Sequence, residues 1–244
     1  MRDPHPKTIA KAEENLLLGT IHQIEAQDLI NQINAAIPAT PFHFTVTRLL
    51  EKLEEENRVV AFDDACSIPR FAWAVRNLME LRILLRFVCQ SQSNLERFNN
   101  DILVVVPKTL QVLISSEHDA SDSRKADHNR LLADIELARS KAGLEKNSRP
   151  LLARTCAAQV GLEKEYIACS TFTSPLVHPS ALVILKTVDQ ESQRPLLTSL
   201  GLKLAGDVIM DARTHIGRYG LKPMNLRERR SSGPPPKKAK RNVN

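Results

Sequence analysis

The stretch FAWAVRNLMELRILLRFVC, residues 71–89, decides the fold. Apolar side chains surround it on nearly every side for about five turns of helix. It is too short and too charged to cross a membrane, so a helix apolar all round belongs in the middle of a helical domain. Its few polar side chains must reach the surface or find partners inside the protein. These polar residues are Arg76, Asn77, Glu80, Arg82 and Arg86.

The rest of the chain has the composition of an all-α protein. It has 244 residues, 42% of them apolar, with only eight glycines, enough to build a helical core. We therefore predict one all-α bundle of about six to eight helices over residues 1–221, followed by a tail, residues 222–244. Outside the central stretch, apolar periodicity predicts helices over residues 7–37, 41–57, 95–116, 124–142, 151–160, 163–186 and 192–219.

Three local signals modify this pattern. Pro107 interrupts the helical pattern of residues 95–116 directly after an ILVVV run, residues 102–106. For this run a kinked helix is favoured over a strand because no partner strand is visible. Ser174-Pro175 resembles a cap followed by a first-turn proline, so we expect a break there that places His178 in the first turn of a new segment. The acidic stretch EKLEEENR, residues 51–58, is typical of a solvated helix face, and residues 58–69 are expected to connect two helices.

Charge is concentrated at the C-terminus. The chain carries a net charge of +6, but eight basic residues and one acidic residue follow Leu221, so residues 1–221 carry about −1. A basic tail rich in proline cannot bury a core, and we expect it to be disordered and to contact nucleic acid or an acidic partner through phosphate-type contacts. A solubilising tail and a nuclear-import signal (PPPKKAKR) are the alternatives. The candidate contacts are Arg227, Arg229, Arg230, Lys237, Lys238, Lys240 and Arg241.

Many signatures of catalysis and compartment are missing from the sequence. No dinucleotide or phosphate-loop motif, HExxH, Glu-x-x-His or GxSxG is present, so neither a cofactor nor a metal is expected. No leader-like or membrane-spanning apolar run occurs, which favours a cytoplasmic protein without a membrane partner, or a nuclear one if the chain is eukaryotic and the tail is an import signal. The four cysteines, Cys66, Cys89, Cys156 and Cys169, form no CxxC pair. Three of them sit in apolar helical contexts and are expected to act as small core residues.

Two sets of residues carry candidate chemistry. Asp207, Asp211 and His215 lie on one helical stripe, for which a solvated or salt-bridged face is favoured over a metal site. His178 is either a core histidine at a bend or a general acid–base in a cleft. In the second case Arg76 would stabilise phosphorane charge, which is the minimum for RNA cleavage without a metal.

A resemblance rests on two short motifs, Arg76-Asn77-Leu78-Met79-Glu80 and a later Ser170 followed by Leu176-Val177-His178-Pro179-Ser180. Over about residues 68–186 the chain resembles a family of uncharacterised, mostly bacterial helical proteins with an R-x-L-x-E helix and an S…vHPS segment. That family is similar in architecture to the HEPN group (higher eukaryotes and prokaryotes nucleotide-binding). The resemblance implies a bundle in which Arg76, Glu80 and His178 approach one another.

Many HEPN proteins are metal-independent ribonucleases in toxin or defence systems, often acting as dimers, with Arg, a polar residue and His on one helix. Here that His is absent, since Glu80-Leu81-Arg82-Ile83 occupies its place. The first hypothesis is therefore a HEPN-like module that binds a partner or nucleic acid in a regulatory or defence role. The alternatives are a ribonuclease using His178 and Arg76, with Glu80 as a further candidate, and a scaffold whose tail alone binds partners. A homodimer is compatible with each.

Overall fold

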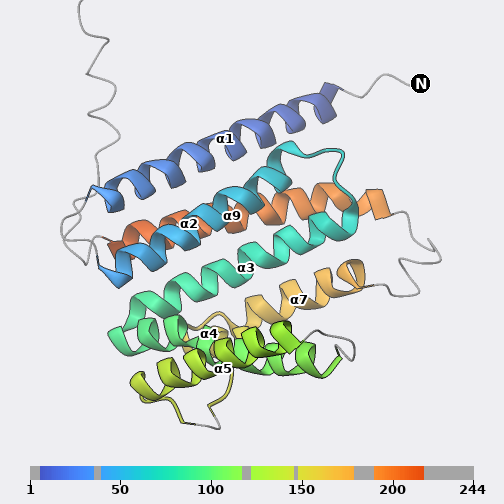
Figure 1. Ribbon diagram of the computed structural model, residues 1–244. Coiled ribbons are helices and arrows are strands. Elements are labelled where there is room, and N and C mark those ends of the chain that lie inside the picture. Colours follow the sequence, from blue (N-terminus) through green and yellow to red (C-terminus); the bar gives the residue numbers. More distant parts are fainter. Residues whose placement is uncertain (1–5, 36–39, 117–121, 146–147, 179–189, 217–244) are drawn as a thin grey trace, which may run out of the picture.

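The computed structural model describes residues 6–35, 40–116, 122–145, 148–178 and 190–216. Within these ranges it contains eight α-helices, one short 3₁₀-helix and no strand, so the predicted all-α bundle is confirmed (Figure 1). The elements are α1 (Pro6–Asn34), α2 (Pro41–Phe62), α3 (Ile68–Gln90), α4 (Gln92–Ser116), α5 (Asp122–Lys141), α6 (Ala153–Gln159), α7 (Glu163–Val177), η1 (Gln190–Gln193) and α9 (Arg194–Ile216).

The helix built from the opening stretch is the centre of the molecule. α3 packs against α2, α4, α6, α7 and α9, and Figure 1 shows it running through the middle of the bundle. Residues on all sides of it are buried, as its unbroken apolar character predicts. Its buried side chains include Phe71, Val75, Leu78, Ile83, Leu85 and Phe87.

Two glycines let neighbouring helices approach closely. A Cβ added at Gly19 of α1 would collide with Ala61 of α2, and one added at Gly201 of α9 would lie 2.7 Å from Val60 Cγ1. α1 runs unbroken past Gly19. The Gly19 carbonyl accepts a hydrogen bond of 3.0 Å from the buried Asn57 side chain. The bare backbone at these positions sets how closely α1, α2 and α9 pack.

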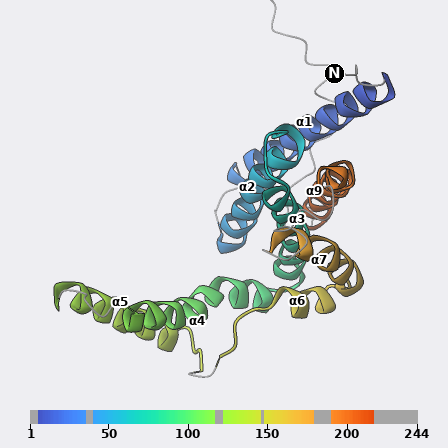
Figure 2. The ribbon, with the colours of Figure 1, turned by 90° about the vertical axis from the view of Figure 1, so that its right-hand side faces the viewer.

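α4 and α5 form an arm. Figure 2 shows them as an antiparallel pair projecting sideways from the rest of the bundle. α4 is capped by Ser91, whose Oγ accepts a hydrogen bond from the Asn94 N–H at 3.1 Å. The helix continues through Pro107, which confirms a helix over a strand for the ILVVV run.

Two expected boundaries are wrong, each because tertiary burial overrides a local signal. α2 continues five residues past Asn57 to Phe62, since Val60 is buried against α9. α7 is not broken at Ser174-Pro175 but runs to Val177, because Thr173 and Leu176 are buried on either side of the proline. The proline lies near the helix end, where few main-chain hydrogen bonds remain to be lost. The last α-helix begins at Arg194, directly after the 3₁₀ turn, rather than at Ser192 as expected.

Two glycines end helices, and three of the four cysteines lie in the core as expected. Gly143 and Gly161, which follow α5 and α6, adopt φ angles of +65° and +74°, the left-handed conformation that ends helices. Cys89, Cys156 and Cys169 are buried in the core, Cys66 is half-buried, and all four are free thiols. Among the described residues, none of the helices combines the length and the apolar character that a membrane crossing requires.

Candidate functional site

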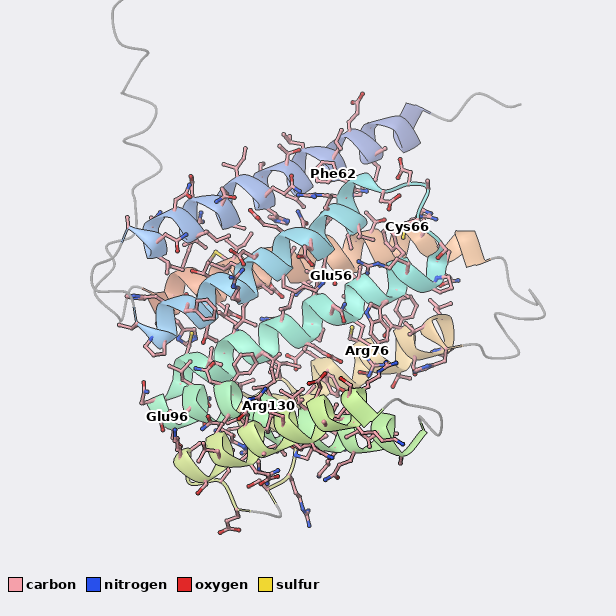
Figure 3. The ribbon with its side chains drawn as sticks, in the orientation of Figure 1. Glu56, Phe62, Cys66, Arg76, Glu96 and Arg130 are labelled. Carbon is pink, nitrogen blue, oxygen red and sulfur yellow. The ribbon has the colours of Figure 1, made fainter. Side chains whose placement is uncertain are left out.

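A buried carboxylate joins α2 to α3. Glu56 of α2 is only 1% exposed and accepts hydrogen bonds of 2.8 Å from Arg70 Nη1 and from Asn77 Nδ2; Figure 3 shows it between the two helices. Lys52 Nζ lies 3.1 Å from its Oε1 atom. A buried carboxylate is tolerated only when it is paired and hydrogen-bonded, so this cluster serves packing. The expectation that residues 51–58 form a solvated face is therefore wrong at Glu56 and Asn57, both buried.

A second ionic cluster joins the C-terminal half of α3 to α9. Asp211 accepts two hydrogen bonds of 2.7 Å from Arg86 Nε and Nη2, and one of 3.1 Å from Arg82 Nε. Arg82 also reaches Asp207 at 2.9 Å, and Lys203 reaches the same carboxylate at 2.6 Å. The hydrogen bond from Arg86 to Asp211 raises the pKa of that guanidinium, although burial opposes it. The predicted salt-bridged face at Asp207 and Asp211 is confirmed.

Arg76 and Glu80 meet one turn apart on α3. Arg76 Nε donates to Glu80 Oε1 at 3.2 Å, and both side chains are partly exposed. Figure 3 shows Arg76 on the side of α3 that faces α7. Burial lowers the pKa of the Arg76 guanidinium, but its hydrogen bond to Glu80 and its interactions with Tyr166 outweigh burial, so the pKa is raised. Arg76 is thus a charged group held by a helical neighbour.

His178 lies away from this pair. It is the C-cap of α7, with an extended backbone, and its N–H donates to the Ser174 carbonyl at 3.2 Å. Its side chain is exposed, so it is not a core histidine at a bend. No hydrogen bond or ion pair in the described part of the chain joins its imidazole to Arg76 or Glu80. The structure therefore brings two of the three candidate residues together and leaves the third separate.

An apolar hollow lies between α7 and α9, with α3 as its floor. Figure 2 shows α7 and α9 on the same side of α3. The groove has a volume of about 360 Å³, within the range of ligand pockets. We call it the α7–α9 groove. Its apolar lining includes Met79, Cys169, Phe172, Leu196, Leu200 and Leu204.

Charges of both signs surround the α7–α9 groove. Glu165 lines it from α7, Lys203 from α9 and Arg82 from the floor. Glu165 and Lys203 are exposed, whereas Arg82 is held by its two aspartates. The mouth therefore offers an acidic group on one wall and a basic group on the other.

The groove contains no activated nucleophile among its lining residues. Burial raises the pKa of the Cys169 thiol to about 11, so the thiol stays protonated near neutral pH. The neighbouring Thr173 hydroxyl donates a hydrogen bond of 2.8 Å to the Cys169 carbonyl within the same helix. The groove presents an apolar surface with charged residues at its rim, an arrangement that suits binding rather than catalysis.

Comparison with known proteins gives no relative from which to transfer a role: no protein-family model, curated protein or solved structure matches this chain.

Sequence reasoning missed the groove and the Glu56 cluster. A signal for Glu56 was present, because Leu49, Leu53, Glu56 and Val60 follow the three-and-four spacing of one helix face. The groove offered no such signal, since its lining comes from three helices far apart in sequence. The tail candidates, from Arg227 to Arg241, lie outside the described residues.

Proposed function

We propose that the chain is a helical binding module of HEPN-like architecture that holds an amphipathic helix of a partner protein in the α7–α9 groove. The observation that carries this proposal is the groove itself, an apolar hollow between two helices on the floor of a third. A groove of this shape receives the apolar face of a helix through side chains spaced at i, i+4 and i+7.

The charges at the rim favour a helix over an uncharged apolar molecule. Glu165 and Lys203 lie on opposite walls, so they complement a helix with basic residues along one flank and acidic residues along the other. The exposed ion pair between Lys203 and Asp207 contributes little to stability, so Lys203 can exchange that partner for an incoming carboxylate at small cost.

The polar groups of α3 support the same proposal. Asn77, Arg82 and Arg86 are engaged by Glu56, Asp207 and Asp211 in contacts that hold helices together. A ribonuclease needs an acid–base group and a phosphate clamp to converge on one substrate. Arg76 is paired with Glu80, and His178 is at the far end of α7. These residues are therefore assigned to architecture.

An apolar fluorophore tests whether the groove is open to ligands. We would titrate 8-anilinonaphthalene-1-sulfonate into wild type and into Ala168→Phe, which places a large ring in the groove. Ile167→Phe is the matched control, because Ile167 is an exposed neighbour on the same helix that does not line the groove. We expect Ala168→Phe to lose the fluorescence that Ile167→Phe keeps. Apolar surface elsewhere contributes equally to both variants, and equal fluorescence would refute the proposal.

The ribonuclease alternative is tested separately with a labelled RNA of mixed sequence in EDTA. We expect no cleavage by wild type, and no difference between wild type, Arg76→Ala and His178→Ala. Cleavage by wild type that is lost in both variants, each shown to be folded by circular dichroism, would make these residues catalytic and replace the proposal.

A further inference from the structure

A small polar pocket lies along the first half of α4, where the chain returns from α5 toward α6. Its volume is about 220 Å³. Two arginines, an amide, a hydroxyl and one carboxylate line it together with two apolar side chains. α4 supplies Arg97, Asn100, Asp101 and Val104, and the connection between α5 and α6 supplies Leu144, Ser148 and Arg149. We call it the α4 pocket.

Hydrogen bonds that do not involve its two arginines shape the α4 pocket. The Leu151 N–H donates to Asp101 Oδ1 at 2.6 Å, which holds the connection against α4. On the α5 side, Arg139 Nη2 and Ser148 Oγ both donate to the Glu145 carbonyl, at 3.0 and 2.8 Å. Figure 2 shows the connection passing from the arm to α6. The pocket is therefore formed before any ligand enters it.

The two arginines of the α4 pocket have no anionic partner. Arg97 and Arg149 reach the pocket from different segments of the chain, and both are exposed. Within the described part of the chain, neither guanidinium makes a hydrogen bond or an ion pair. With Asp101 as the one carboxylate, two positive charges and one negative charge give the lining a net charge of +1. Guanidinium groups gathered in one pocket repel each other, and an anion between them would replace that repulsion by attraction.

The unused donors favour a phosphate group over a carboxylate. Arg97 and Arg149 each present a planar guanidinium fork that can hold two oxygens of one anion. The Asn100 amide adds further N–H donors. A carboxylate offers only two oxygens to these groups, whereas the phosphoryl group of a monoester offers three and carries up to two negative charges.

The size and apolar lining of the pocket limit what the phosphate is attached to. Its volume of about 220 Å³ is below the roughly 300–1,000 Å³ of drug-sized ligand sites, so it admits a phosphoryl group with a short stem. Val104 and Leu144 offer contact to apolar atoms of that stem. Among the described lining residues there is no aromatic ring on which a nucleotide base could stack.

We propose that the α4 pocket binds a small phosphate monoester. Arg97 and Arg149 hold the phosphoryl oxygens between them, and Asn100 donates to the same group. The apolar stem lies against Val104 and Leu144. The proposal is independent of the α7–α9 groove, which shares no lining residue with the α4 pocket.

Titration calorimetry of the full chain with phenyl phosphate tests the site. Arg149→Met removes one guanidinium, and Arg154→Met is the matched control, because Arg154 is an exposed arginine that pairs with Glu163 and does not line the pocket. We expect Arg149→Met to bind phenyl phosphate at least tenfold more weakly than wild type and Arg154→Met to bind it unchanged. Binding to other basic residues contributes equally to both variants, and circular dichroism checks that each is folded.

Two further probes separate the parts of the ligand. Benzoate keeps the ring but replaces the phosphate by a carboxylate, and we expect it to bind wild type at least tenfold more weakly than phenyl phosphate. Inorganic phosphate lacks the stem, so it should compete with phenyl phosphate but bind more weakly. No binding of phenyl phosphate by wild type, equal affinities of the two arginine variants, or a benzoate or inorganic phosphate affinity equal to that of phenyl phosphate would each overturn the proposal.

Discussion

Replacing Asp211 by alanine should destabilise the bundle strongly. The carboxylate accepts two hydrogen bonds of 2.7 Å from Arg86 and one of 3.1 Å from Arg82. Asp211, Arg82 and Arg86 are 13%, 14% and 28% exposed. Breaking a fully buried pair costs about 3–5 kcal/mol, whereas an exposed pair contributes about 0–1 kcal/mol. Because the cluster is only partly buried, we expect Asp211→Ala to lower the free energy of unfolding by about 2–3 kcal/mol.

The assay is urea unfolding followed by circular dichroism, with the slope m compared between variants to check that the transition is the same. Lys203→Ala is the control, because Lys203 is 65% exposed and touches the same network through Asp207. We expect it to change the free energy of unfolding by less than about 0.5 kcal/mol. A loss for Asp211→Ala below about 1 kcal/mol, or one equal to that of Lys203→Ala, would refute the structural reading of this cluster.

Three further predictions concern other parts of the fold. Burial lowers the pKa of His22 despite the nearby Glu25. As pH falls below about 6.5, His22 therefore becomes protonated in the unfolded chain before it does so in the folded protein. The free energy of unfolding should decline from there toward the native pKa, and His22→Gln should flatten that decline in urea titrations at several pH values. Gly201→Ala should lower the free energy of unfolding by about 1–3 kcal/mol, because the new Cβ would lie 2.7 Å from Val60 Cγ1. Adding Val60→Ala should relieve this clash, and full stability of Gly201→Ala alone would contradict the packing. At pH 8 iodoacetamide should modify Cys66 well before Cys169, which is buried and only about 0.1% thiolate at a pKa of about 11; mass spectrometry of the tryptic peptides reads the order, and faster modification of Cys169 would show that its helix opens readily.

The central helix was predictable because its composition alone forces burial. Residues 71–89 are apolar on every side, and only the interior of a helical domain accommodates that pattern. The stripe of Asp207 and Asp211 was predictable as a salt-bridged face, since four-residue spacing aligns them. Its partners on α3 were not, because periodicity within one helix says nothing about which helix packs beside it.

The misplaced features share a physical cause. Glu56 follows Leu49 and Leu53 on the inward face, but the acidic residues around it hide that spacing. Pro175 is a strong local breaker, yet the buried Thr173 and Leu176 keep α7 intact around it. In each case a local signal was outweighed by tertiary packing. The α7–α9 groove depends wholly on such packing, so it became visible only with the fold.

Selection of helical peptides tests the central claim most directly. A phage-displayed library of helical peptides would be selected on wild type, and each enriched peptide measured by fluorescence anisotropy against wild type, Ala168→Phe and Ile167→Phe. We predict peptides with apolar residues at i, i+4 and i+7 that bind Ala168→Phe at least tenfold more weakly than wild type and bind Ile167→Phe unchanged. Peptides that bind all three proteins equally, or a selection that enriches no amphipathic helix, would contradict the groove as the binding site.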